Sequence, residues 1–211
     1  MSKRNAIFFL VLAGALGVLL SRTAPAQTDS ATLIEAMQAG GTVIFLRHAA
    51  TNASEVDTGR LGDRAGQRNL SPEGIEQARA LGEAYRALGI AFDRIIVSPV
   101  FRARDTAELA FGPVAIEISM DVVADDYAGG QIGQMIQATR RLLATSPPQE
   151  SNLLLVGHRT PLQMATGLSF PDTILPEGAM AIFRPGGGET ELLGTVRAEH
   201  LIAAAMAQSS P

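Results

Sequence analysis

Three short runs of apolar residues constrain the fold of this chain more than any other feature. They lie at residues 43–46, 95–97 and 153–156, and they end at an arginine, a serine-proline pair and a glycine, respectively. A strand that is apolar on both faces is typical of a parallel sheet covered by helices on both sides. The runs therefore predict three inner strands of such a sheet.

Patterns typical of helices lie between and after these runs. Ser71-Pro72 can cap a helix and open its first turn, and apolar residues then recur at helical spacing until Gly89. We expect further helices at residues 32–38, 98–110 and 132–143 and from residue 161, and a hairpin or edge pair at residues 180–183 and 191–196. Residues 51–69 lack periodicity and predict a long surface loop near the site. Buried strands that alternate with amphipathic helices predict a three-layer α/β/α fold with a mostly parallel central sheet.

The first 26 residues have the features of an export signal. Lys3 and Arg4 precede an apolar run at residues 6–20, and Ala24-Pro25-Ala26 provides the small residues that signal peptidase recognises. The apolar run is shorter than the roughly 20 residues that a membrane-spanning helix needs. We therefore expect a cleaved signal peptide at residues 1–26 and a periplasmic or secreted domain at residues 27–211, with its core at about 42–196. A retained N-terminal anchor is the alternative.

Charge and composition exclude several classes of function. The formal net charge is −4, and the basic residues Lys3, Arg4 and Arg22 all precede the first acidic residue, Asp29, so the expected mature chain is more acidic still. We therefore expect no nucleic-acid partner and, after signal cleavage, no membrane partner. The chain has no cysteine, and its only lysine is Lys3. This excludes thiolate chemistry, disulfides, and a phosphate-loop or Schiff-base lysine in the mature chain.

Charged and polar side chains follow each of the three apolar runs. Arg47-His48 follows the first, the segment from Ser98 to Arg102 follows the second, and Gly157-His158 follows the third. In such sheets ligands bind at the carboxyl ends of the strands, so neighbouring strands would bring two arginines and two of the 3 histidines into one pocket. Guanidinium and imidazole N–H groups match phosphate oxygens, and the sequence therefore predicts an anion site.

These segments resemble the motifs of the histidine phosphatase superfamily, in the branch that includes the phosphoglycerate mutases (branch 1). Arg47-His48-Ala49 corresponds to the family's Arg-His-Gly at the end of the first strand, and Gly157-His158 corresponds to its late Gly-His. The second motif of the family is matched by Ser98, Arg102, Ala103, Thr106 and Ala107, and its helix start by Asn69-Leu70-Ser71-Pro72-Glu73-Gly74 with Gln77-Ala78. The resemblance runs in order from about residue 42 to 185 and implies a phosphoglycerate mutase-like fold.

The resemblance also implies roles for individual residues. His48 would attack phosphorus as a neutral imidazole and form a phosphohistidine, while its other ring nitrogen donates to a fixed acceptor, expected in the backbone. Arg47 and Arg102 would hold the phosphoryl oxygens, His158 would donate to the same oxygens as an imidazolium, and Thr51 is a further candidate contact. Fixed positive charge would make a metal ion unnecessary, so we expect neither a metal nor another cofactor.

The general acid is the least defined part of the pattern. Many members of the family have a glutamate in a Leu-x-Glu context after the helix of the second arginine, but residues 119–130 contain no glutamate. Asp125 is the nearest match, with Asp121 and Asp126 as alternatives, and all three could instead form a solvated acidic turn. Some phosphohistidine phosphatases lack this acid, because an imidazole leaving group needs less help from a proton than an alkoxide does.

Two functions follow from these expectations. The first is an exported phosphatase that acts on a small phosphomonoester or a phosphoprotein through a phosphohistidine on His48. The alternative is a non-catalytic module that binds an anion or a phosphoprotein with the same residues. A serine hydrolase and a zinc-helix hydrolase are disfavoured, because the chain contains neither Gly-x-Ser-x-Gly nor His-Glu-x-x-His.

Overall fold

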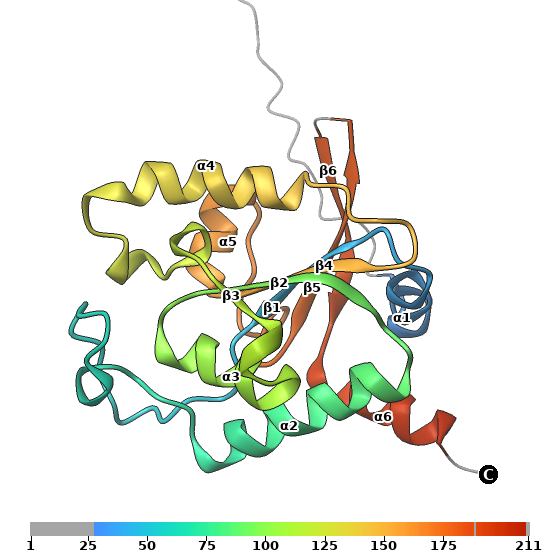
Figure 1. The fold of residues 1–211 in the computed structure, drawn as a ribbon, viewed down its shortest axis with the longest axis horizontal. Helices are drawn as coiled ribbons and strands as arrows, with labels where there is room; N and C mark the ends of the chain where they lie inside the picture. Colours follow the sequence, from blue (N-terminus) through green and yellow to red (C-terminus); the bar gives the residue numbers. More distant parts are fainter. Residues whose placement is uncertain (1–27, 188, 210–211) are drawn as a thin grey trace, which may run out of the picture.

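The sheet is built around the three strands that the apolar runs predict. The computed structural model describes residues 28–187 and 189–209 (Figure 1), and the predicted signal peptide at residues 1–26 lies outside them. The strands are β1 (Val43–Arg47), β2 (Phe92–Val97), β3 (Glu117–Ile118), β4 (Asn152–Gly157), β5 (Met180–Gly186) and β6 (Glu189–Val196), in the order β3-β2-β4-β1-β5-β6. Strands β2, β4 and β1 lie side by side and run parallel, which confirms the predicted inner strands.

The remaining strands complete the sheet at its two edges. Strand β3 pairs parallel with β2, and it was not predicted because it contains only two residues. Strand β5 pairs antiparallel with β1, and β6 pairs antiparallel with β5. The predicted pair at residues 180–183 and 191–196 is therefore a hairpin that ends the sheet, and its tip extends away from the helices in Figure 1. The sheet is mostly parallel, as expected.

Helices cover both faces of this sheet. The described α-helices are α1 (Ser30–Ala39), α2 (Pro72–Ala87), α3 (Phe101–Phe111), α4 (Ile132–Leu143), α5 (Arg159–Thr166) and α6 (Ala198–Gln208). Short 3₁₀ helices are η1 (Arg64–Gly66), η2 (Pro113–Ala115), η3 (Met120–Val122), η4 (Asp125–Tyr127) and η5 (Gly129–Gln131). Helix α6 was not predicted, because its alanine-rich sequence has no clear helical periodicity. No helix in the described part of the chain is long and apolar enough to cross a membrane.

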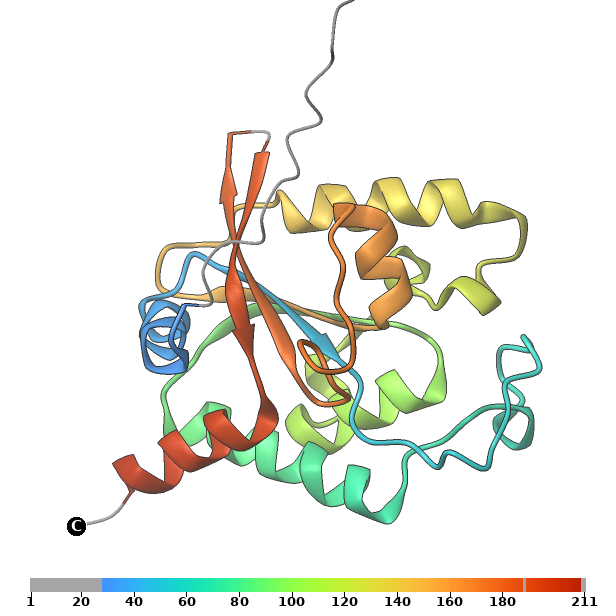
Figure 2. The same cartoon turned by 180° about the vertical axis from the view of Figure 1, so that it is seen from behind.

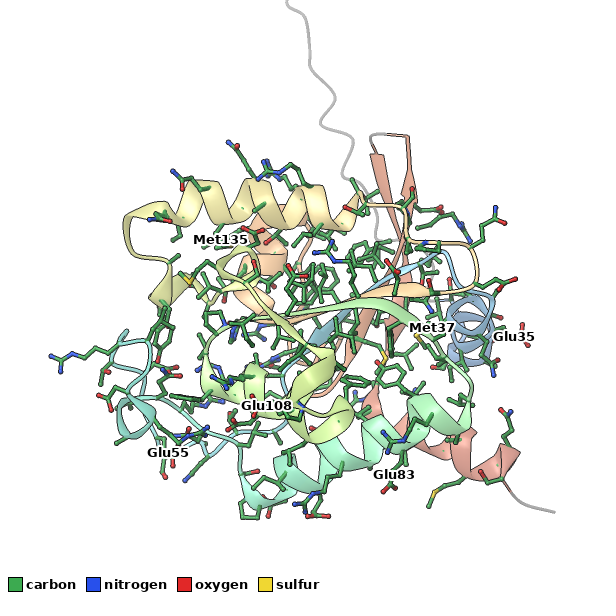
Figure 3. All side chains as sticks on the ribbon, viewed as in Figure 1. Glu35, Met37, Glu55, Glu83, Glu108 and Met135 are labelled. Carbon is green, nitrogen blue, oxygen red and sulfur yellow. The ribbon has the colours of Figure 1, made fainter. Side chains whose placement is uncertain are left out.

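An apolar core lies on each face of the sheet, and the two cores give the predicted three layers. Helices α1, α2, α3 and α6 pack on one face, and α4 and α5 pack on the other (Figures 1 and 2). Alternate residues of β1 point into the two cores. Ile44 and Leu46 belong to the first core, under α1, α2, α3 and α6, and Val43 and Phe45 belong to the second, under α4 and α5. Met37, on the sheet-facing side of α1 in Figure 3, is fully buried in the first core.

The start of α2 fixes the segment that follows His48. The Ser71 hydroxyl caps the helix by accepting from the Gly74 N–H at 3.1 Å, and Pro72 occupies the first turn, as predicted. The Ser71 N–H donates to the Ala50 carbonyl at 3.0 Å. A Cβ atom on Gly74 would lie 1.9 Å from the Ala50 carbonyl oxygen, so only glycine permits this close approach.

Helix α3 begins later than the sequence predicts. Its N-cap residue is Val100, which makes no side-chain capping bond, and Ser98-Pro99 lies before the helix. The acceptor for the Phe101 N–H comes instead from residues 51–69, through the Gln67 Oε1 atom at 2.9 Å. Gln67 is fully buried, so this contact joins the long loop firmly to the helix that carries Arg102.

Candidate active site

The carboxyl ends of β1, β4 and β2 bring together four of the predicted site residues. Arg47, the last residue of β1, is in register with Gly157, the last residue of β4. His48 and His158 follow them, with ring centroids 5.3 Å apart. Arg102 lies in the first turn of α3, just after β2, and its charge acts on both imidazoles. We call Arg47, His48, Arg102 and His158 the arginine–histidine cluster; each is at most 9% exposed.

His48 is held as a neutral imidazole with a free Nε2 atom. Its Nδ1 atom lies 2.9 Å from the Ala49 carbonyl oxygen. A carbonyl can only accept, so Nδ1 carries the proton, and the lone pair is on Nε2. Burial, and then the charges of Arg102 and Arg47, hold the pKa of His48 well below its usual value. The backbone acceptor expected from the sequence is therefore the Ala49 carbonyl.

Arg47 is fixed by acceptors from residues 167–179. Its Nη1 atom donates to the Asp172 carboxylate at 2.5 Å and to the Leu175 carbonyl at 2.8 Å. Its Nη2 atom lies 3.6 Å from a carboxylate oxygen of Glu177. These contacts leave the Nε atom, which is buried and has no partner. The guanidinium is thus held in one orientation, with its buried Nε donor left free.

Arg102 is fixed in the same way by the long loop. Its Nη1 atom donates to both carboxylate oxygens of Asp57, at 2.9 and 3.0 Å. The Tyr127 hydroxyl, at 2.6 Å, and the Arg68 backbone N–H, at 3.0 Å, donate to the same carboxylate. Burial would raise the pKa of Asp57, but these hydrogen bonds and the charge of Arg102 bring it below the usual value. Asp57 is therefore ionised beside Arg102.

His158 differs from the prediction in its charge. Its Nε2 atom lies 2.8 Å from the Ser98 hydroxyl, and its Nδ1 atom is buried without a partner. Burial, and then the charges of Arg102, His48 and Arg47, hold the pKa of His158 well below its usual value. The expected imidazolium is wrong for the site without a bound anion, because a third buried cation beside two arginines is unfavourable. His158 is the N-cap residue of α5 but makes no side-chain capping bond.

The two unpartnered atoms indicate what the cluster can bind. Among the described residues, Arg47 Nε and His158 Nδ1 are the buried side-chain nitrogen and oxygen atoms without a hydrogen-bond partner. Such atoms are rare, and each costs about 1–3 kcal/mol. Arg47 Nε is always a donor, so only an acceptor can satisfy it. The geometry therefore suits an oxyanion placed next to His48.

The structure gives Thr51 other partners than phosphate. The Thr51 hydroxyl donates to Glu177 at 2.8 Å and accepts from Arg68 Nε at 2.7 Å. Arg68 also donates to Glu177, at 2.7 Å. Thr51 thus lies close to the cluster, in a network that includes the carboxylate beside Arg47. A contact between Thr51 and phosphate stays a prediction.

Of the three candidate acids, Asp125 is the one that the fold places near the cluster. Asp125 lies in η4 and is half-buried, whereas Asp121 and Asp126 are exposed. Burial, and to a smaller extent the charge of Asp126, raise the pKa of Asp125, while the nearby charge of Arg102 acts against this rise. Asp121 lies farther along, where its backbone carbonyl accepts from Thr139 of α4.

Several residues of the site were not found from the sequence. Asp57 and Gln67 belong to residues 51–69, which were predicted only as a loop near the site. Glu55, labelled in Figure 3, lies in the same loop, and its carboxylate accepts from the Asn69 N–H at 2.7 Å. Asp172 and Glu177 belong to a loop in which no pattern was recognised. None of these residues lies in a motif or a periodic segment, so no local signal marks them. The described residues contain no group of three or more histidine, cysteine or acidic side chains that could hold a metal ion.

Comparison with known proteins supports the family resemblance over part of the chain. The model of the histidine phosphatase superfamily (branch 1) matches residues 43–132, which include Arg47, His48 and Arg102. The resemblance to the histidine phosphatase superfamily that the sequence indicates is therefore supported over residues 43–132. No curated protein sequence matches this chain.

Solved structures share the fold at low sequence identity. The protein histidine phosphatase SixA, complexed with tungstate, is 14% identical, with a TM-score of 0.53 over 76% of this chain and 99% of that chain. The product of an open reading frame of Mycobacterium tuberculosis is 17% identical, with a TM-score of 0.52 over 74% and 98%. A mycobacterial glucosyl-3-phosphoglycerate phosphatase complexed with VO3 is 15% identical, with a TM-score of 0.50 over 74% and 98%. These likenesses confirm the phosphoglycerate mutase-like fold class of this chain.

The two neutral histidines predict a loss of stability in mild acid. Below about pH 6.5 an unfolded histidine takes up a proton, whereas folded His48 and His158 do not, because burial lowers their pKa. The free energy of unfolding should therefore fall as the pH drops through this range, by up to about 1.4 kcal/mol per pH unit for each histidine. Urea denaturation at pH 7 and pH 5.5 measures this slope. A His48→Gln/His158→Gln variant should have a flatter slope, and equal slopes would contradict the prediction.

Proposed function

We propose that the protein is an exported phosphatase that hydrolyses a phosphomonoester or a phosphoprotein through a phosphohistidine on His48. The observation that carries this proposal is the free Nε2 atom of a neutral His48 beside two unpartnered buried nitrogen atoms, Arg47 Nε and His158 Nδ1. A nucleophile next to hydrogen-bond donors that lack an acceptor is suited to attack on a phosphoryl group. The oxyanions in two structures of the same fold, tungstate and VO3, support this use of the site.

In the first step, the Nε2 lone pair of His48 attacks phosphorus. An N–P bond forms, the P–O bond to the leaving group breaks, and the leaving oxygen takes its proton from Asp125. Arg47, Arg102 and His158 bind the other phosphoryl oxygens, whose negative charge persists through the transition state. Because fixed guanidinium groups supply the positive charge, the proposed step uses no metal ion.

In the second step, water attacks the phosphohistidine. The Asp125 carboxylate takes a proton from this water, the N–P bond breaks, and the electron pair returns to Nε2 of His48. Phosphate leaves and the neutral imidazole is restored. The Ala49 carbonyl keeps the Nδ1 proton in place during both steps, so that Nε2 remains the reacting atom.

A substrate screen tests the proposal. The purified protein would be assayed with p-nitrophenyl phosphate, small alkyl phosphates, phosphoserine peptides and phosphohistidine peptides, and phosphate release would be measured from pH 4 to pH 8. Brief mixing with a radiolabelled phosphodonor should trap an acid-labile label on the protein. If no substrate is hydrolysed and no label is trapped, while phosphate still raises the melting temperature, the non-catalytic binding module becomes the function.

We expect Asp125→Asn to separate substrates by their leaving groups. The acid works when protonated, so with an alkyl phosphate the rate should fall as the pH rises through the raised pKa of Asp125. The variant should phosphorylate His48 about 100-fold more slowly with an alkyl phosphate and lose this pH dependence. With p-nitrophenyl phosphate, whose leaving group needs no proton, the first burst of p-nitrophenol should change little, whereas steady turnover falls because Asp125 also activates the water. Asp126→Asn is the matched control, because Asp126 is the exposed neighbour. An unchanged alkyl phosphate rate in Asp125→Asn would remove Asp125 from the mechanism.

The export part of the proposal depends on the sequence of residues 1–26 alone. Its support is the order of basic residues, apolar run and small residues described above. N-terminal sequencing of the protein from a periplasmic or culture fraction tests it. A chain that begins at Gln27 supports cleavage after Ala26, and a chain that begins at Met1 or Ser2 rejects it.

A further inference from the structure

Ser98 has no role in the mechanism above, yet its hydroxyl contacts His158. Ser98 is fully buried directly after β2, and its Oγ atom lies 2.8 Å from His158 Nε2. The same Oγ atom accepts from the Val100 backbone N–H at 3.3 Å. The Ser98 Oγ atom therefore already accepts one hydrogen bond. His158 Nε2 is the acceptor within reach of the hydroxyl proton of Ser98.

The direction of this hydrogen bond decides which His158 nitrogen carries the proton. If the hydroxyl donates, Nε2 holds the lone pair, and the single proton of the neutral ring is on Nδ1. Nδ1 is the buried atom without a partner, so it then becomes an N–H donor available to a ligand. The opposite direction would place a bare lone pair at Nδ1, which would repel a phosphoryl oxygen.

We propose that Ser98 is a positioning residue that holds His158 in the Nδ1–H tautomer, so that Nδ1 can donate to a phosphoryl oxygen. The tautomer follows from the hydrogen bonds alone, whereas its effect on turnover rests on the proposed function. A buried hydroxyl suits this task, because it removes the choice between the two tautomers without adding charge beside Arg47 and Arg102. A neutral donor is also consistent with the lowered pKa of His158.

Imidazole ¹⁵N NMR tests the tautomer without reference to activity. The protein would be labelled at its 3 histidines, and a His158→Gln spectrum would assign the His158 signals. At pH 7.5 we expect a protonated Nδ1 and a bare Nε2 in the native protein. Ser98→Ala should shift the ring toward the Nε2–H form, and Ser98→Thr, which keeps the hydroxyl, should restore Nδ1–H. An Nε2–H ring in the native protein, or an unchanged ring in Ser98→Ala, overturns the proposal.

Kinetics then test the consequence for turnover. Ser98→Ala should lower kcat by about 10- to 100-fold with a smaller change in KM, because the donor acts on charge in the transition state. Thr139→Val is the matched control: it removes a fully buried hydroxyl from α4, away from the cluster, and should alter neither the tautomer nor kcat. Equal kcat in Ser98→Ala and native protein contradicts the positioning role. If the native protein has no turnover, the proposed function is contradicted instead. The NMR test of the tautomer does not depend on that outcome.

Discussion

A His48→Ala variant should lose phosphatase activity by about 10⁴-fold or more and trap no phosphoryl label. The loss is large because no other described residue offers a bare imidazole nitrogen next to the unpartnered donors. His158 is close, but its Nε2 atom is engaged with Ser98. Activity would be measured as kcat/KM with the best substrate of the screen, and the label by rapid acid-free gel filtration.

The control for this experiment is His200→Ala. His200 is exposed in α6, where its ring contacts the Ser30 hydroxyl at 3.0 Å, far along the chain from the cluster. This variant should keep full activity and full labelling. Circular dichroism and the urea midpoint should show that His48→Ala is folded. A folded His48→Ala protein with more than a tenth of the native activity would show that another residue is the nucleophile.

Arg102→Ala should have the second largest effect, a loss of about 10³-fold in kcat/KM. Under the proposed function, the variant removes a donor to the transferred phosphoryl group, and it also leaves the Asp57 carboxylate without its arginine. That carboxylate would then repel the phosphate. Arg102→Lys should recover little of the loss, because an ammonium cannot hold Asp57 and a phosphoryl oxygen with the planar geometry of a guanidinium.

Arg104→Ala is the matched control for Arg102. Arg104 lies on the exposed side of the same helix and pairs with Glu108, one turn later, which Figure 3 shows on α3. Its removal should change kcat/KM by less than twofold. The double variant Asp57→Asn/Arg102→Ala separates the two effects, because it removes the repelling charge. If Arg102→Ala alone loses less than tenfold, Arg102 does not bind the phosphoryl group.

The sequence predicts the parts of the site that regular structure positions. Arg47, His48 and His158 come directly after apolar strands, and parallel strands end at one edge, so strand order alone brings these residues together. Arg102 follows from its spacing after the second strand. The start of α3 was misplaced because Ser98-Pro99 resembles an N-cap, whereas the acceptor for its first turn comes from Gln67, distant in sequence.

The carboxylates around the cluster could not be predicted in the same way. Asp57, Asp172 and Glu177 lie in loops, where no periodicity relates sequence position to place in the fold. Their partners become clear only when the loops are placed against the sheet edge. The charge of His158 was wrong for a related reason, because the burial and nearby charge that lower its pKa are properties of the folded site.

The resident carboxylates have a consequence for selectivity. Asp172 and Asp57 form ion pairs with Arg47 and Arg102, respectively, so the charge of each arginine is already partly neutralised. A chloride ion or a carboxylate that enters the site must compete with Asp172 or Asp57 for the guanidinium group, so its binding is weak. A tetrahedral oxyanion gains more, since it also satisfies Arg47 Nε and the ring of His158. Under the proposed function, the same competition would weaken the binding of free phosphate and so favour release of the product.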